Sequence, residues 1–165
     1  MHLDNIQLLY EYNYWASAKI LLAATNLTSE QFLAPASFPN GNMRGTLVHL
    51  VAAEWIWRMR CDEGIYPSAL LDPTEFPTYV SVLERFQVEE GKMRAYLSRI
   101  TEEDLNSPIT YRHTSGREHS EMLWQILTHV VMHGMQHRAE AAAILTDFGY
   151  SPGDIDLIMY LRERG

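Results

Sequence analysis

Apolar side chains recur every three or four residues in the first part of the chain, which is the spacing of one face of an α-helix. Residues 6–24 carry such a stripe, and no Pro or Gly occurs before Pro35. The pattern therefore predicts a long first helix. Thr28 and Gln31 have the spacing of a small capping box, which predicts one further helical turn before the chain is broken between Pro35 and Gly41.

Two more stretches with the same spacing follow. Asn42 can cap the exposed backbone N–H groups of a second helix that runs toward Cys61, and residues 64–73 read as a loop. Pro77 is poorly placed inside a helix, so the third helix is predicted to start just after it and to continue to Ile100. Gly91 weakens the middle of this helix without ending it.

A fourth long periodic stretch ends at Phe148, with Gly149 as a left-handed stop. Ser120 is the residue predicted to cap its start. Before it, residues 108–119 hold a short alternating stretch and a Ser-Gly pair, which suits a small hairpin or an irregular excursion. Asp154 is predicted to open a short last helix.

Four long amphipathic helices, one long connection between the third and fourth, and a short C-terminal helix describe an all-α protein, a four-helix bundle. The chain has 165 residues, 47% of them apolar, and this is the usual size of one folding unit. We therefore expect residues 1–165 to form a single domain. A chain of this length buries enough surface to fold without a metal, so any metal is expected to be functional rather than structural.

Charge and cysteine content exclude several classes of protein. The formal net charge of −8 repels nucleic-acid phosphates, so no nucleic-acid partner is expected. Cys61 is the single cysteine, which excludes an internal disulfide and zinc-finger or CxxC sites, and suits a reducing cytoplasm. The first twenty residues lack the pattern of an export signal, and no apolar run reaches the ~18 residues of a membrane span. The sequence therefore predicts a cytoplasmic protein without a membrane partner.

Three of the seven histidines repeat every four residues: His129, His133 and His137. Successive members of such a series lie only about 40° apart around a helix, so His133 and His137 can point at one ion. Random placement of seven histidines gives about 0.3 HxxxH pairs but only about 0.01 overlapping double pairs. The triple spacing therefore needs a cause, although a histidine on an apolar face is also often a core residue bonded to a carbonyl.

His49 is the candidate third ligand, because it lies among Leu47, Leu50 and Val51 on the inner side of the second helix. An unpaired polar group is costly in that position. Metal sites in bundles are assembled from inward side chains of facing helices. Three neutral imidazoles leave coordination positions open for water or substrate, which is typical of a catalytic ion. Imidazole suits several divalent transition metals; zinc or nickel is expected first, with iron or copper as alternatives.

The chain resembles the DinB family of metal-binding bundles, also called DinB/YfiT-like, which is distinct from the polymerase of the same name. Four stretches carry the resemblance: residues 12–16 (YNYWA), 45–55 (GTLVHLVAAEW), 123–138 (LWQILTHVVMHGMQHR) and 155–162 (IDLIMYLR). Their order and spacing cover nearly the whole chain. The chain departs from the family pattern at Met132, where Asn is usual, and at residues 139–140, where Gly-Gln is usual.

The resemblance implies a four-helix bundle whose metal ligands are His49, His133 and His137, the same set that the spacing indicates. It also implies a homodimer. Family relatives include transferases and isomerases that use a low-molecular-weight thiol, and others have no demonstrated activity. The expected partner is therefore a small-molecule substrate or such a thiol.

The catalytic and substrate-binding residues stay open, and two side chains are candidates for a supporting role. His129 matches a family histidine that is not normally a ligand, so it is expected beside the ligands or in the core. Glu140 lies one turn beyond His137 and could orient that imidazole or accept a proton, or else pair with an arginine in solvent. Glu54 lies about 140° past His49 and is a weaker candidate for a base.

Three interpretations follow. The first is a metal-dependent transferase or hydrolase that acts on a small, thiol-conjugated or other substrate through an open three-histidine site. The second is a metal-binding stress-response protein without turnover, which a closed coordination sphere or the lack of an adjoining pocket would favour. The third is an interaction bundle whose histidines belong to the core.

Overall fold

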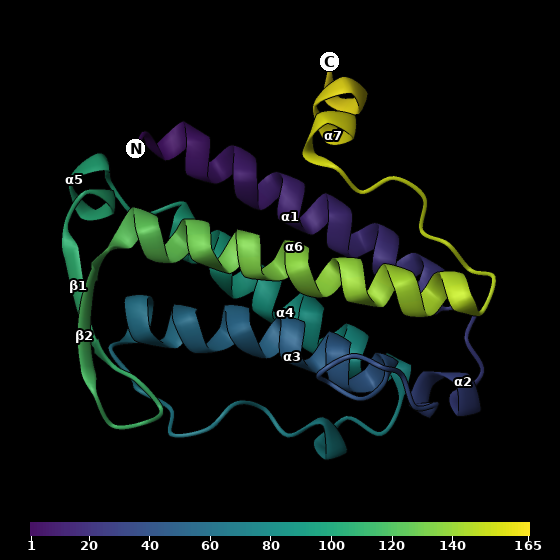
Figure 1. Ribbon diagram of the computed structural model, residues 1–165. Coiled ribbons are helices and arrows are strands. Elements are labelled where there is room, and N and C mark those ends of the chain that lie inside the picture. Colours follow the sequence, from purple (N-terminus) through teal and green to yellow (C-terminus); the bar gives the residue numbers. More distant parts are fainter.

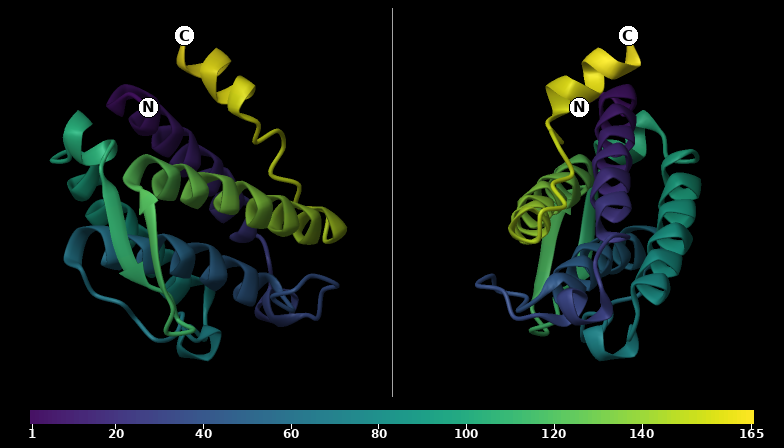
Figure 2. Two further views of the ribbon diagram at one scale, coloured as in Figure 1. Left: turned by 60° about the vertical axis from the view of Figure 1, so that its left-hand side comes forward. Right: turned by 90° about the vertical axis from the view of Figure 1, so that its right-hand side faces the viewer.

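The computed structural model describes residues 1–165, and its four long helices form the predicted bundle (Figure 1). These helices are α1 (Leu3–Ala24), α3 (Met43–Arg58), α4 (Tyr79–Leu97) and α6 (Leu123–Asp147). Both α1 and α3 pack against α4 and α6, so α1 and α3 lie at opposite corners of the bundle. The end view in Figure 2 shows α6 and α4 on either side of α1. The predicted fold class is confirmed.

Several local signals act as predicted at the helix ends. The Asn42 side chain accepts a hydrogen bond from the backbone N–H of Gly45, which caps α3. Thr28 and Gln31 form a reciprocal capping box at α2 (Ser29–Leu33). Gly149 follows α6 with a φ of +83°, a left-handed conformation that a residue with a Cβ rarely adopts.

The connections contain shorter elements. Strands β1 and β2 pair as an antiparallel hairpin in which Tyr111 lies opposite His119, and the hairpin lies beside the C-terminal end of α3 (Figure 1). A π-helical turn, η1, continues α3 without a break. The bounds of these elements are η1 Met59–Glu63, η2 Pro73–Glu75, α5 Glu102–Leu105, β1 Pro108–Arg112, β2 Glu118–Met122 and α7 Leu157–Arg164.

Three predicted boundaries are wrong. Ser120 does not cap the fourth helix, because it lies in β2 opposite Thr110 and its backbone belongs to the hairpin; α6 begins at Leu123. Asp154 does not open the last helix, which begins at Leu157 after Asp156. The third long helix does not continue to Ile100, because α4 ends at Leu97, with Ser98 as its C-cap.

Two apolar clusters form the core. The first lies around Tyr10, Met93 and Leu127, and the second around Ile20, Val48 and Leu145. Buried polar side chains lie between them along the bundle: Asn13, Ser17, Glu54, His137 and Arg138. The middle of the bundle is therefore a polar layer, and one of its members is a predicted metal ligand.

None of the helices combines the length and the apolar character needed to cross a lipid bilayer.

Candidate metal centre

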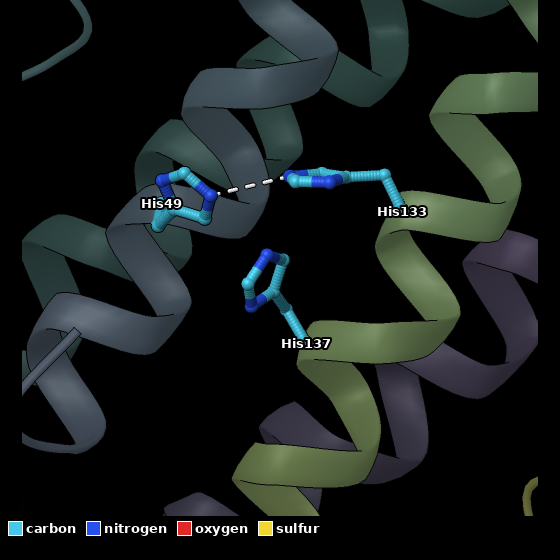
Figure 3. Close-up of side chains that lie close together, drawn as sticks. All are labelled: His49, His133 and His137. Carbon is cyan, nitrogen blue, oxygen red and sulfur yellow. Dashed lines mark hydrogen bonds between the residues drawn. The ribbon is translucent and has the colours of Figure 1, made fainter. Parts of the chain in front are cut away.

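His49 on α3 and His133 and His137 on α6 point toward one another where the two helices face each other (Figure 3). The Nε2 atoms of His49 and His133 are 3.2 Å apart. One ring nitrogen from each of the three side chains lies within 4.8 Å of the others. The ring centroid of His137 is 4.5 Å from that of His49 and 4.4 Å from that of His133. The structure thus brings together the three histidines that the sequence singled out.

Helix geometry explains this arrangement. His133 and His137 are one turn apart on α6, so both rings leave the helix on nearly the same side. His49 lies between Val48 and Leu50, which are buried, and α3 packs directly on α6. Three imidazoles therefore meet at the contact between the two helices without any help from a loop.

The spacing of the nitrogens fits one metal ion. Two nitrogen ligands about 2.05 Å from a tetrahedral ion are about 3.3 Å from each other. The 3.2 Å between the Nε2 atoms of His49 and His133 is close to that value. A set of three imidazoles also suits zinc, nickel, iron or copper by ligand type.

Glu140 contacts the outer nitrogen of His137. The His137 Nδ1 atom is 2.7 Å from Glu140 Oε2, and Asn40 Nδ2 lies 3.5 Å from the same nitrogen. Since a carboxylate only accepts, Nδ1 carries the hydrogen and donates it, which leaves Nε2 with its lone pair. This is the usual partner arrangement of a metal-ligating histidine.

The environment disfavours protonation of His49 and His133. Burial lowers the pKa of His133 to about 4, and the neighbouring His137, His49 and His129 add to the effect. Burial and His137 also lower the pKa of His49, which Glu140 partly offsets. Neutral imidazole is the form that binds a metal, so near neutral pH little proton release is needed to bind one.

Two cavities reach this cluster, and both are lined by His49 and Leu70. One, of about 230 Å³, is lined by His49, His133, His129, Trp57 and Arg60, together with the hairpin residues His113 and Thr114. The other, of about 420 Å³, is lined by His49, by residues 39–41 of the loop before α3, and by Leu70, Leu71 and Pro73. The cluster is therefore accessible to small molecules.

His129, Glu54 and Cys61 lie outside the cluster. The His129 ring lies next to that of His133, with centroids 5.6 Å apart, and burial lowers its pKa. Glu54 instead faces α1, where it accepts hydrogen bonds from Tyr14 Oη and Asn13 Nδ2 at 3.1 and 3.3 Å. Burial raises the pKa of the Cys61 thiol to about 12, so this side chain stays protonated, as expected for a packing residue.

The polar layer behind the cluster fixes the position of α6. Arg138, next to His137, donates a hydrogen bond to Asn13 Oδ1, and Asn13 in turn donates to Glu54. Gly134 leaves room for this contact: a Cβ at this position would come within 2.8 Å of Arg138 Nη1 and 2.9 Å of Asn13 Oδ1. One chain of hydrogen bonds therefore links α6, α1 and α3 beside the histidines.

Sequence reasoning missed three residues around the cluster: Asn40, Arg60 and His113. Asn40 reaches His137 from the loop before α3. His113, in the turn of the hairpin, and Arg60, in the π turn η1, both line the 230 Å³ cavity. No periodic pattern marks a residue that a loop or an irregular turn brings to a site.

Comparisons with known proteins agree with this fold. The sequence model of the DinB family matches residues 1–164. Protein DinB of Bacillus subtilis (strain 168) is 24% identical over 159 residues, which cover 93% of this chain and 91% of that protein. The solved structure of Bacillus subtilis YfiT, a probable metal-dependent hydrolase with an unusual four-helix bundle topology, has a TM-score of 0.62 and 20% identity, with 90% of this chain and 89% of that chain covered. Because the family model matches almost the whole length of the chain, this chain belongs to the DinB family.

Proposed function

We propose that this protein is a metal-dependent hydrolase of a small molecule, with His49, His133 and His137 as the metal ligands. One observation carries the proposal: the three ligand nitrogens converge within 4.8 Å of one another, and His49 also lines both cavities. The description of YfiT, which shares the fold, supports the same reaction class.

A divalent transition metal bound here, zinc or nickel first and iron or copper as alternatives, would supply a Lewis acid and lower the pKa of a water or thiol. Glu140 has a positioning role in this account, because its bond to Nδ1 turns Nε2 of His137 toward the other two imidazoles. His129, one helical turn before His133 on α6, lines the same cavity as His133. We propose that His129 is the general base, which would accept the proton of the attacking water.

The two other interpretations of the sequence are weaker. A metal-binding protein without turnover would be favoured by a closed coordination sphere or by a cluster without a pocket, whereas two cavities adjoin these histidines. A bundle with core histidines would bond each ring to a carbonyl, whereas His133 Nε2 faces His49 Nε2. A thiol transferase would use the same ligands and remains an outcome of the test.

Hydrolysis of a panel of small esters, thioesters and amides by zinc- or nickel-loaded protein tests the proposal. Turnover should disappear on chelation, return with metal, and be absent in His133→Ala, while His2→Ala, at an exposed position, should retain it. Turnover only in the presence of added low-molecular-weight thiols would replace hydrolase by transferase. A complete lack of turnover in both series would contradict the catalytic proposal and favour a metal-binding protein without activity.

The homodimer that the family resemblance implies stays a prediction. Exposed apolar side chains on α1 and α4, such as Leu22 and Val88, would suit a contact between two copies. Light scattering should give twice the 19.0 kDa mass of the chain. A monomeric mass would contradict the prediction.

A further inference from the structure

Arg60 is a buried arginine at the end of α3. It lies in the π turn η1, and only 4% of its surface is exposed. Its guanidinium carbon is 4.7 Å from the centre of the Trp57 ring and 5.2 Å from that of the Tyr111 ring. Trp57 belongs to α3 and Tyr111 to β1, so the hairpin and the helix together hold this side chain in place.

Arg60 differs from the other buried arginines because its guanidinium makes no hydrogen bond within the chain. Arg58 pairs with Glu89 and Glu63, and Arg138 donates to Asn13. None of the ion pairs of the chain includes Arg60, and its buried Nε atom has no hydrogen-bond partner. A charge that is buried without a partner costs free energy. Consistent with this cost, burial lowers the pKa of the Arg60 guanidinium.

Arg60 lines the 230 Å³ cavity that also reaches His49 and His133. Arg60 is the only arginine or lysine among the residues that line it. Ile56, Trp57 and Leu70 supply its apolar walls. The cavity therefore combines a metal-ligating end, one positive charge and apolar sides.

We infer that Arg60 binds a carboxylate group of the molecule that occupies this cavity, an apolar monocarboxylate. The planar guanidinium fork matches a carboxylate with two parallel hydrogen bonds. In the metal-free chain, a phosphate monoester carries close to two negative charges and would leave one without a partner here, since Arg60 is the only arginine or lysine of the lining. The identification of this molecule as the substrate rests on the proposed function; the binding of the carboxylate does not.

Because the carboxylate site would exist without a metal, binding is tested on the chelator-treated full chain. Benzoate is the probe, and benzamide is its uncharged counterpart. Titration calorimetry should show that benzoate binds, that Arg60→Gln weakens its binding about 10- to 100-fold, and that Arg60→Lys is intermediate. Arg112→Gln, which removes the same charge from an exposed position on β1, should bind benzoate as the unchanged chain does.

The proposed function can fail separately. His137→Ala should lose the metal but keep its affinity for benzoate, because Arg60 is untouched and His137 does not line this cavity. If Arg60→Gln does not fold, the unchanged chain still decides, since it should prefer benzoate to benzamide by at least about tenfold. Equal affinity of the unchanged chain and Arg60→Gln overturns the inference. No binding of benzoate to the unchanged chain also overturns it.

Discussion

The Nδ1 atom of His137 lies 2.7 Å from Glu140 Oε2, and this contact selects which nitrogen of the ring faces the other histidines. The same carboxylate partly offsets the pKa depression at His49, so its charge acts on two of the three imidazoles. Without the carboxylate, the ring could rotate or present its other tautomer.

Glu140→Gln tests this relationship. A glutamine cannot supply the charge, so metal affinity should fall about 10- to 100-fold while the fold is retained. Competition with a chromophoric chelator measures the affinity, and circular dichroism checks the helix content. Glu118→Gln, an exposed position on β2, is the control with the same change of charge. Equal affinity in the two variants would show that Glu140 does not support the site.

Gly134→Ala tests the close contact between α6 and α1. Its Cβ would lie 2.8 Å from Arg138 Nη1 and 2.9 Å from Asn13 Oδ1, so the hydrogen bond between these side chains must shift. We expect the free energy of unfolding in urea to fall by about 1–3 kcal/mol.

Gly91→Ala is the matched control, because it also lies inside a long helix but nothing lies within 4 Å of its added Cβ. Alanine should raise the free energy of unfolding there by about 0.5–1 kcal/mol. A gain of stability in both variants would contradict the described packing around Arg138.

Glu54 should make stability depend on pH. Burial raises its pKa to about 7 from an ordinary value of 4.5, against the opposing effects of the Tyr14 hydrogen bond and Arg138. The folded state thus holds a proton that the unfolded state releases. The resulting stabilisation is present below pH 4.5 and is lost as the pH rises through 7, an effect of about 3 kcal/mol.

Urea unfolding of the original chain and of Glu54→Gln at pH 5 and pH 8 measures this effect. Glutamine cannot titrate, and its amide keeps one carbonyl oxygen that can accept from either Asn13 or Tyr14, so any hydrogen bond that it loses is lost at both pH values. The stability of the original chain relative to the variant should therefore fall by about 2–3 kcal/mol from pH 5 to pH 8. A difference that is the same at both pH values would contradict the raised pKa.

The features that the sequence predicts are those that depend on helical periodicity. His133 and His137 are one turn apart, and His49 lies among apolar neighbours, so pattern alone places all three on facing helices. The cap at Asn42 and the stop at Gly149 are local signals that involve only nearby backbone. Such features do not depend on which distant segment packs against them.

The features that the sequence does not predict depend on distant contacts. Ser120 has the chemistry of a cap, but pairing with Thr110 places it in a strand. Arg60 is buried only because η1 departs from α-helical geometry and because Tyr111 arrives from the hairpin. Glu140, which contacts the Nδ1 atom of His137, could be proposed from sequence spacing because it lies three residues further along the same helix. Asn40 could not, because it belongs to a loop 97 residues away.

Metal content of the untagged protein tests the central claim most directly. Elemental analysis should find close to one transition-metal ion per chain, and His133→Ala should abolish it, since removal of one of three ligands leaves two imidazoles to hold the ion. His2→Ala, at an exposed position, should keep full occupancy. Full occupancy in His133→Ala, or none in the unchanged chain even after metal is supplied, would contradict the three-histidine centre.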